Sequence, residues 1–338
     1  MTNLRFPLRL LPSDLDLMVL KTMEYHEIIA FSFLSKKSLS LVKSLRLSLE
    51  EARINICKRP DMYLDFGNIS VLLKWKMGKN DQEMTSFDDV PLQVDVSTQK
   101  IDYITMFLPT IQSAAFTWSN QKKSIREWIQ HLCSIFQYKC QKVNFYTGTI
   151  RFDIQSLRNT FPKLEEITIY GSLEEGPSDH DIQSTQIILK AFLPYVQNFH
   201  LRRVPLNKNL TIQHIGMANS KELVIYYPRN LKLENLLILN VERYTIDVNQ
   251  FHLRDLNRFL KLWTKGANSK LKYLLVHGNI ETIPAGSVLL KGLQVEEEDE
   301  EDGSKLKYTI RNCHGICAQI QMLNYVRFLV SVEFTVLN

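Results

Sequence analysis

Residues 253–276 read LRDLNRFLKLWTKGANSKLKYLLV, and this stretch combines two kinds of apolar spacing. From Leu253 to Trp263 apolar side chains recur three and four positions apart, as on one face of a helix. From Leu271 to Val276 apolar residues crowd into a short run, which is typical of a strand. The stretch therefore predicts a helix that leads directly into a strand.

The same unit recurs from about residue 124 onward. A helix is predicted over 125–136, and the strand pattern L-x-x-[IFL]-x-[ILV] or a close variant follows at 143–145, 164–169, 196–201, 223–225 and 236–241. Repeated helix–strand units predict a right-handed coil around a parallel sheet. The pattern resembles degenerate leucine-rich repeats, whose units bury their apolar faces on each other. Residues 115–338 are therefore expected to form one repeat-like helix–strand domain.

The spacing differs in the first 114 residues. Residues 71–76 and 92–97 alternate with a period of two, so 51–114 is expected to be a β-rich connecting region. Residues 1–50 instead show helical spacing, for example at Leu15, Val19 and Met23, and predict three short helices. Three short helices have little core of their own and are expected to lean on a partner or on the next domain. The predicted fold class is thus α+β or α/β, with an N-terminal three-helix domain, a β-containing linker and a leucine-rich-repeat-like domain.

Two segments carry recognisable orders of residue types. The first runs from Phe6 to Leu47 and contains the Leu11-Pro12 pair, Asp14-Leu15, Val19-Leu20, Met23, Glu27-Ile28 and Leu34-Ser35-Lys36. This order resembles the F-box. Residues 209–277, with YYP, LENLLILN and LNRFLKLW, resemble the type 2 F-box-associated domain of nematode F-box proteins.

The resemblance implies a non-catalytic adaptor of a Skp–cullin–F-box ubiquitin ligase. Residues 1–50 would bind the Skp-type subunit and, through it, a cullin-RING ligase, by inserting apolar anchors into a helical groove. The residues expected at that interface are Leu8, Leu11, Pro12, Leu15, Val19, Leu20, Met23, Ile28 and Leu34.

The C-terminal domain would capture a target protein that the sequence does not identify. Tyr226, Tyr227 and Arg229 are candidates for that contact, because tyrosine and arginine are favoured at interaction hot spots. The concave face of the coil is where we expect them to act.

Three alternatives to the ligase adaptor remain open. The first is an interaction scaffold that is not assembled into a ligase. The second is a nucleic-acid binder, since the formal charge is +5 and becomes 5 + 7 = +12 without the seven acidic residues of 296–302. No basic stripe interleaved with aromatic residues supports that alternative, so no nucleic-acid partner is expected. The acidic run itself is expected to be a solvated hairpin loop.

The third alternative is an enzyme, and the motifs give it little support. Cys313 and Cys317 flank His314, but a structural zinc site needs four ligands, so no metal is expected. Residues 178–181 read SDHD, yet contiguous side chains rarely converge as a catalytic triad. No phosphate-binding glycine loop is present. We therefore expect no catalytic residue and no cofactor.

The location is expected to be intracellular, cytoplasmic or nuclear. The five cysteines are an odd number scattered over 338 residues, as in a reducing compartment. No apolar run approaches the about 20 residues of a membrane span, so no membrane contact is expected. Charged residues and prolines near the start interrupt what would be the apolar core of a secretion signal.

Overall fold

The structure is a computed structural model that divides into two compact units. It describes residues 13–77, 85–102, 110–120, 122–139, 142–147, 153–161, 164–172, 179–204, 220–228, 240–250, 252–279, 285–299, 306–326 and 329–337. Unit 1 comprises the described residues up to 143 together with 153–161. Unit 2 comprises residues 144–147 and the described residues from 164 onward.

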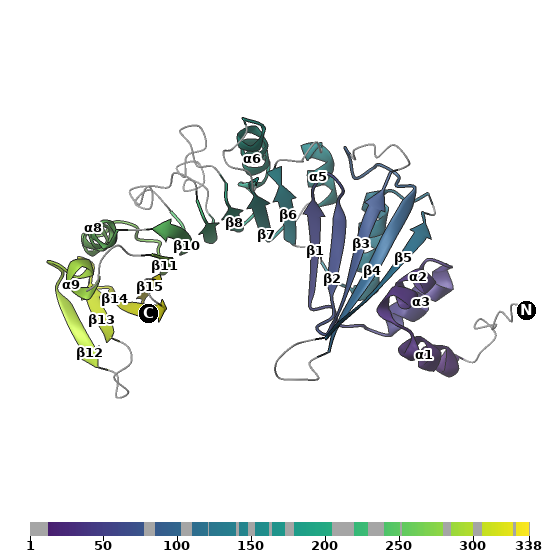
Figure 1. Cartoon of the computed structure of the whole chain (residues 1–338), viewed down its shortest axis with the longest axis horizontal. Helices are drawn as coiled ribbons and strands as arrows, with labels where there is room; N and C mark the ends of the chain where they lie inside the picture. The colour runs from purple at the N-terminus through teal and green to yellow at the C-terminus, as the bar shows by residue number, and fades with distance from the viewer. Residues whose placement is uncertain are drawn as a thin grey trace, which may run out of the picture. The chain divides into compact units, whose positions relative to one another are not determined.

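The sheet of unit 1 is an antiparallel meander whose strands pair in sequence order (Figure 1). Its strands are β1 (Glu51–Ile56), β2 (Asp61–Asp65), β3 (Ile69–Lys76), β4 (Gln93–Asp102) and β5 (Thr110–Ser119). Alternate residues point into the core, and Ile54, Met62, Leu73 and Val96 lie side by side there, each at most 1% exposed. β5 carries no charged side chain, and no other strand among the described residues pairs with its outer edge.

Five helices belong to unit 1. They are α1 (Ser13–Thr22), α2 (Tyr25–Ser32), α3 (Lys36–Ser44), α4 (Ile125–Phe136) and α5 (Ile154–Thr160). Side chains cap several helix starts, such as Ser124, whose hydroxyl accepts from the Glu127 amide and whose own amide donates to the Glu127 carboxylate. The helix pattern predicted over 125–136 is confirmed as α4.

The N-terminal helices pack on the meander through aromatic rings. Tyr25 stacks on Phe66 with ring centroids 3.8 Å apart, and His26 stacks on Phe116 of β5 at 4.3 Å. Both contacts come from α2, whose Ile28 and Ile29 are at most 3% exposed. The expectation that these short helices lean on a neighbouring part of the chain therefore holds.

The predicted fold class is wrong. Fifteen strands and eight helices lie in the described residues, so strands dominate. A separate N-terminal three-helix F-box is not evident among the described residues, because short helices with narrow apolar faces bury them on the sheet. Residues 51–102 and 110–114 are not a connecting region but most of that sheet.

Unit 2 is built on a mixed sheet. From β6 the strand order is β6-β7-β8-β9-β10-β11-β15-β14-β13-β12, where β7 to β11 pair in parallel and the last four strands pair antiparallel. The parallel side contains β6 (Lys142–Tyr146), β7 (Glu166–Tyr170), β8 (Asn198–Arg202), β9 (Glu222–Tyr226), β10 (Arg243–Gln250) and β11 (Tyr273–Asn279). The antiparallel side contains β12 (Val295–Asp299), β13 (Leu306–Arg311), β14 (Cys317–Val326) and β15 (Leu329–Val336).

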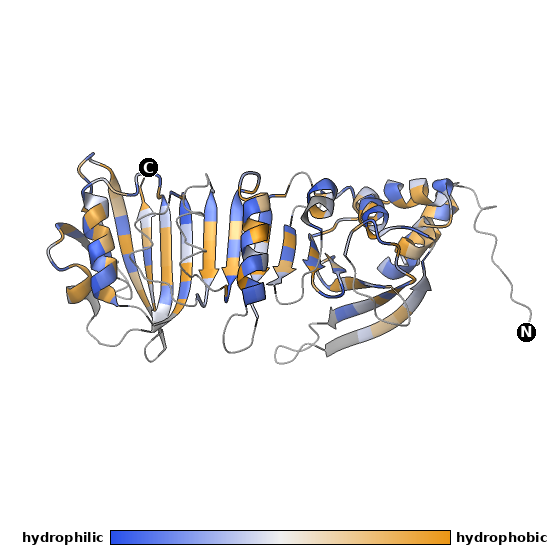
Figure 2. Ribbon diagram, turned by 90° about the horizontal axis from the view of Figure 1, so that it is seen from above, coloured by the Kyte–Doolittle hydropathy of each residue, from blue (hydrophilic) through white to orange (hydrophobic). Residues whose placement is uncertain are grey.

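Helices α6 (Asp179–Phe192), α8 (Leu253–Thr264) and α9 (Ala285–Leu289) accompany this sheet. Phe192 of α6 meets Phe145 of β6, and Trp263 of α8 meets Phe334 of β15 at 5.0 Å between ring centroids. One row of side chains beneath the helices is almost completely buried and contains Ile167, Phe199, Leu223, Tyr244, Leu274 and Phe334. Hydrophilic and hydrophobic residues alternate along several of these strands in Figure 2.

The prediction of a leucine-rich-repeat-like domain is also corrected here. The parallel part resembles the expected helix–strand coil, but the antiparallel hairpins after β11 end it. Residues of the predicted strand 236–239 lie outside the described part of the chain, and the strand that follows is β10. Alternation with a period of two in residues 306–336 makes hairpins more favourable there than further crossover helices.

The acidic run was expected to be a loop, but its first half is strand. Glu296–Asp299 belong to β12, which pairs with β13 so that Glu298 lies opposite Lys307. In a strand neighbouring carboxylates point to opposite sides, and this alternation lowers the repulsion that a compact run would suffer. None of the described helices is long and apolar enough to cross a membrane.

Candidate protein-interaction surface

The two sides of the unit 2 sheet differ in their residues. Side chains at Phe199 and Leu201 of β8 point beneath the helices and are fully buried, whereas the alternate residues His200 and Arg202 point to the other side. We call this other side the solvent-facing side. Polar contacts join its neighbouring strands, since His200 Nδ1 lies 3.7 Å from Glu166 and Arg243 Nε forms an ion pair with Glu222 at 3.9 Å.

Four side chains form a continuous row on the solvent-facing side at the carboxyl ends of the strands. We call it the Tyr–Arg row, and its members are Tyr146, Tyr170, Arg202 and Tyr226. The rings of Tyr146 and Tyr170 are stacked, with centroids 4.6 Å apart. The guanidinium carbon of Arg202 lies 5.5 Å from the Tyr170 ring centroid and 4.5 Å from that of Tyr226.

Strand register produces this row. Tyr170 pairs with Arg202, and Arg202 pairs with Tyr226, so the three side chains project from neighbouring parallel strands at the same height. The two ring faces attract the guanidinium cation and restrict its rotamers. Arg202 remains exposed in spite of these contacts. Rigid aromatic residues beside an accessible arginine are the composition of protein-interaction hot spots.

Backbone hydrogen bonds lock the strand ends that carry the row. The Gly171 amide donates to the Arg202 carbonyl at 2.8 Å, and the Arg203 amide donates to the Tyr226 carbonyl at 2.8 Å. Arg203 and Tyr227 both have positive φ, at 56° and 50°, which turns the chain away directly after each strand. Tyr227 is 46% exposed, and the Arg203 guanidinium lies 5.9 Å from its ring centroid.

The structure brings part of the predicted target-binding set together. Tyr226 belongs to the Tyr–Arg row and Tyr227 follows it, whereas Arg229 lies outside the described residues. Sequence reasoning missed Tyr146, Tyr170 and Arg202. Their positions could have indicated them, because each of these three residues directly follows the last buried apolar residue of its strand.

The predicted Skp-contacting residues divide into three groups. Leu8, Leu11 and Pro12 lie outside the described residues. Leu20 and Ile28 are at most 3% exposed and pack inside unit 1. Leu15 and Leu34 are 45% and 60% exposed, while Val19 and Met23 are half-buried.

Met18 of α1 was not predicted and is 64% exposed. It lies one helical turn from Leu15, so α1 presents two large apolar side chains to solvent.

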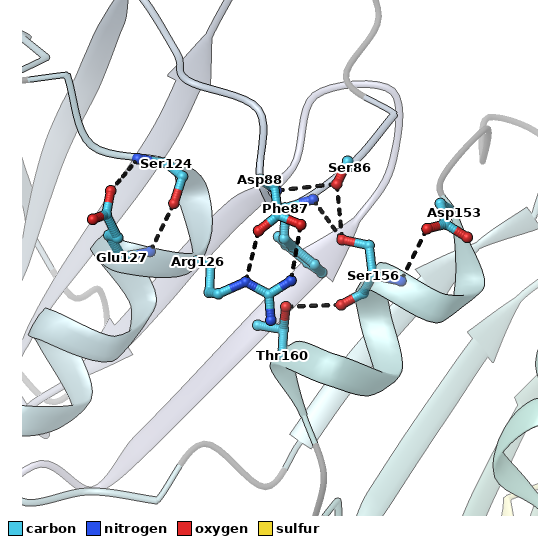
Figure 3. Close-up of polar contacts among 9 residues, drawn as sticks. All are labelled: Ser86, Phe87, Asp88, Ser124, Arg126, Glu127, Asp153, Ser156 and Thr160. Atoms are coloured by element: carbon cyan, nitrogen blue, oxygen red, sulfur yellow. Dashed lines mark hydrogen bonds and ion pairs between the residues drawn. The ribbon is translucent and has the colours of Figure 1, made fainter.

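A second polar cluster, in unit 1, has a structural role (Figure 3). The Ser156 hydroxyl accepts from the Phe87 amide at 3.0 Å and pairs with the Ser86 hydroxyl at 2.9 Å. Arg126 binds Asp88 through Nε and Nη2 at 2.8 and 3.1 Å, and the hydrogen bond from this guanidinium lowers the pKa of Asp88. These contacts tie residues 86–88 to the starts of α4 and α5, so we call the cluster the helix-start clamp.

Residue types of a catalytic triad also lie in one register on unit 2. Asp247, His277 and Ser331 come from adjacent strands, and His277 Nδ1 is hydrogen-bonded to the Ser331 hydroxyl. Ser331 is 0% exposed and lies in a regular strand, so it cannot meet a substrate as a nucleophile does. His180 and Asp181 of the SDHD run lie on α6, and Asp181 is buried and accepts from Thr147 at 2.9 Å. Ser178 lies outside the described residues.

Cysteines and other metal ligands do not cluster in the described part of the chain. No group of three His, Cys, Asp or Glu side chains that could hold a metal ion occurs there. The described cysteines Cys57, Cys133, Cys313 and Cys317 are not joined in disulfides.

His131 of α4 titrates below the usual range. Burial together with the positive charges of Lys123 and Lys43 lowers the pKa of His131 to about 4. The Ser32 hydroxyl donates to the Ile29 carbonyl at 2.6 Å, so at 2.8 Å it accepts from His131 Nε2. The imidazole also stacks on Phe33 at 3.9 Å. The folded chain therefore holds His131 neutral.

This neutral imidazole predicts a pH dependence of stability. The unfolded chain binds a proton near pH 6.5 and the folded chain only near pH 4, so stability from this group is full above pH 6.5 and is lost as pH falls toward 4. The wild-type protein should lose unfolding free energy between pH 7.5 and pH 5, and His131→Gln should lose less of it, by on the order of 1 kcal/mol. The difference is kept this small because the ring is only partly buried. Urea unfolding of both proteins at the two pH values measures this difference. Identical losses in the two proteins would contradict the assignment.

Comparison with known proteins identifies one segment of the chain. Residues 211–276 match a family model described as F-box associated. The described part of this segment includes β9, β10, α8 and the first part of β11, and therefore Tyr226 of the Tyr–Arg row. The F-box itself is not detected in the chain. No curated protein and no solved structure matches the chain. The match thus supports an F-box-associated domain at residues 211–276.

Proposed function

We propose that this chain is the target-recognition adaptor of a Skp–cullin–F-box ubiquitin ligase and that it performs no catalysis itself. The observation that carries the proposal is the solvent-facing Tyr–Arg row, which borders and partly lies within the segment that matches the F-box-associated model. A rigid row of aromatic and cationic side chains on a regular sheet is suited to holding a protein partner. Ubiquitin transfer would then follow from proximity of the target to the partner enzyme.

The N-terminal segment supplies the second contact in this proposal. Its sequence resembles the F-box, and the structure leaves Leu15, Met18 and Leu34 exposed. Exposed large apolar side chains on a short helix are suited to a groove on a Skp-type subunit. The buried Leu20 and Ile28 would support these residues from beneath rather than touch the partner.

Co-purification with a Skp-type subunit and a cullin tests the proposal. We expect the full chain to retain both proteins and the double variant Leu15→Asp/Met18→Asp to lose them, because two charges would enter an apolar groove. The matched control is Ile187→Asp/Tyr195→Asp, which changes two side chains of unit 2 that are 52% and 60% exposed. The control should retain both partners.

Two results would overturn the proposal. A folded wild-type chain that retains no Skp-type subunit would remove the adaptor role. Retention of the Skp-type subunit without any cullin would favour an interaction scaffold outside the ligase.

A further inference from the structure

The Tyr–Arg row contains a cation, Arg202, that pairs with no carboxylate of the described residues. Among the described residues, Arg202 contacts the rings of Tyr170 and Tyr226, and no Asp or Glu lies within ion-pair distance of it. Its guanidinium is exposed and is held from two sides. Binding a partner would therefore cost Arg202 little further side-chain entropy, because the two rings already restrict it in the free protein.

A second arginine on the same side shows the opposite arrangement. Arg243 stacks on Tyr273, with its guanidinium carbon 4.4 Å from the ring centroid, and lies 3.9 Å from Glu222. The stacking resembles that of Arg202, but the charge has a partner. Comparison of the two arginines separates the effect of stacking from the effect of an unbalanced charge.

Charged side chains on the neighbouring strands contact residues other than Arg202. On the neighbouring strands Glu166 lies beside His200, and Glu222 lies beside Arg243. Asp247 is two strands away from Arg202, a distance of about 10 Å from the strand spacing, where salt already screens much of the repulsion. An incoming carboxylate could therefore pair with the Arg202 guanidinium without displacing a carboxylate partner among the described residues.

The number of cations favours a carboxylate over a phosphate. A phosphorylated side chain carries about −1.5 to −2 charges and is usually held by a cluster of arginines. Among the four members of the row Arg202 is the one cation, and the guanidinium of the neighbouring Arg203 lies over Tyr227 instead. One planar guanidinium matches one carboxylate through two parallel hydrogen bonds. Tyr146 and Tyr170 extend the row as an aromatic floor for the residues next to that carboxylate.

We propose that the Tyr–Arg row binds an extended segment of the target protein by seating one Asp or Glu side chain on Arg202. The inference rests on the proposed function for the nature of the partner as a target protein. It does not depend on assembly with a Skp-type subunit, so the two proposals can fail separately.

Peptide binding to the purified full chain tests the proposal. The probe is a fluorescent library of ten-residue peptides with random flanks and a fixed central Glu, and the comparison libraries carry Gln or phosphoserine at that position. We expect the wild-type chain to bind the Glu library about tenfold more tightly than the Gln library, as for a charge-assisted bidentate contact. Arg202→Gln should abolish this preference, and Arg202→Lys should keep only part of it.

Arg243→Gln is the matched control and should keep the full preference, because Glu222 already neutralises that cation. Equal affinity of the wild-type chain for the Glu and Gln libraries would overturn the proposal, as would an unchanged preference in Arg202→Gln. Tighter binding of the phosphoserine library would also overturn it and assign the row to phosphorylated targets. Selective binding by a chain that retains no Skp-type subunit would leave this inference standing while the ligase proposal fails.

Discussion

Replacing Gly171 with alanine is expected to lower the unfolding free energy by at least about 3 kcal/mol, at the upper end of the cost of overpacking. A Cβ atom at this position would lie 2.3 Å from the carbonyl oxygen of Arg203 and 2.9 Å from its carbonyl carbon. Both are backbone atoms, and Arg203 is held by its own hydrogen bond to Tyr226. The chain can relieve the overlap only by breaking the hydrogen bonds that fix the strand ends.

Gly315→Ala is the control for this experiment. A Cβ there meets no atom within 4 Å, but φ is +79°, so the variant should cost only about 1–2 kcal/mol from backbone strain. Chemical unfolding of both variants, followed by circular dichroism, gives the loss of unfolding free energy from steric overlap in Gly171→Ala and from backbone strain in Gly315→Ala. A smaller loss for Gly171→Ala than for Gly315→Ala would show that the strand ends are looser than the structure indicates.

Removing the Phe87 ring is expected to destabilise unit 1 by about 3–5 kcal/mol, as for other phenylalanines deleted from a core. Phe87 is 0% exposed and packs edge-on against Phe161, with ring centroids 5.4 Å apart. Its carbonyl accepts from the Arg126 amide at 2.9 Å, and its amide donates to Ser156. Phe87→Ala would therefore leave a cavity at the centre of the helix-start clamp.

The control for this variant is Phe116→Ala. Phe116 is 38% exposed on β5 and stacks only on His26 among the described rings, so its loss should cost about 1 kcal/mol. Urea midpoints of the two variants, compared at equal slope, measure the difference. Similar losses would mean that the clamp contributes little to the stability of unit 1.

Local elements could be predicted where one period dominates a segment. The helical spacing from Leu253 to Trp263 became α8, and the period of two in 71–76 became most of β3. Strands β1 and β2 lie within the region expected to be β-rich but were not located individually, because runs of six and five residues give a weak periodic signal. The overall topology could not be predicted, since it depends on which distant segments pair, for example β11 with β15.

The candidate surface was predictable only in part. Tyr226 and Tyr227 were recognised from their residue type, but Arg202 gains its role from strand register, which places it between Tyr170 and Tyr226. Similarly, the exposure of Leu15 and the burial of Leu20 depend on the meander beneath the helices. A helical pattern shows that apolar residues share a face without showing what covers that face.

The absence of charge on β5 has a consequence for how the protein behaves at high concentration. An edge strand presents unpaired backbone groups, and proteins commonly guard such edges with charged side chains. The sequence of β12, VEEED, is strongly acidic, and like charges on two molecules oppose edge-to-edge pairing. β5, with the sequence TIQSAAFTWS, has no such guard on its described residues. At high concentration we therefore expect edge-to-edge pairing between molecules to begin at β5, and acidification would weaken the charge repulsion at β12 as well.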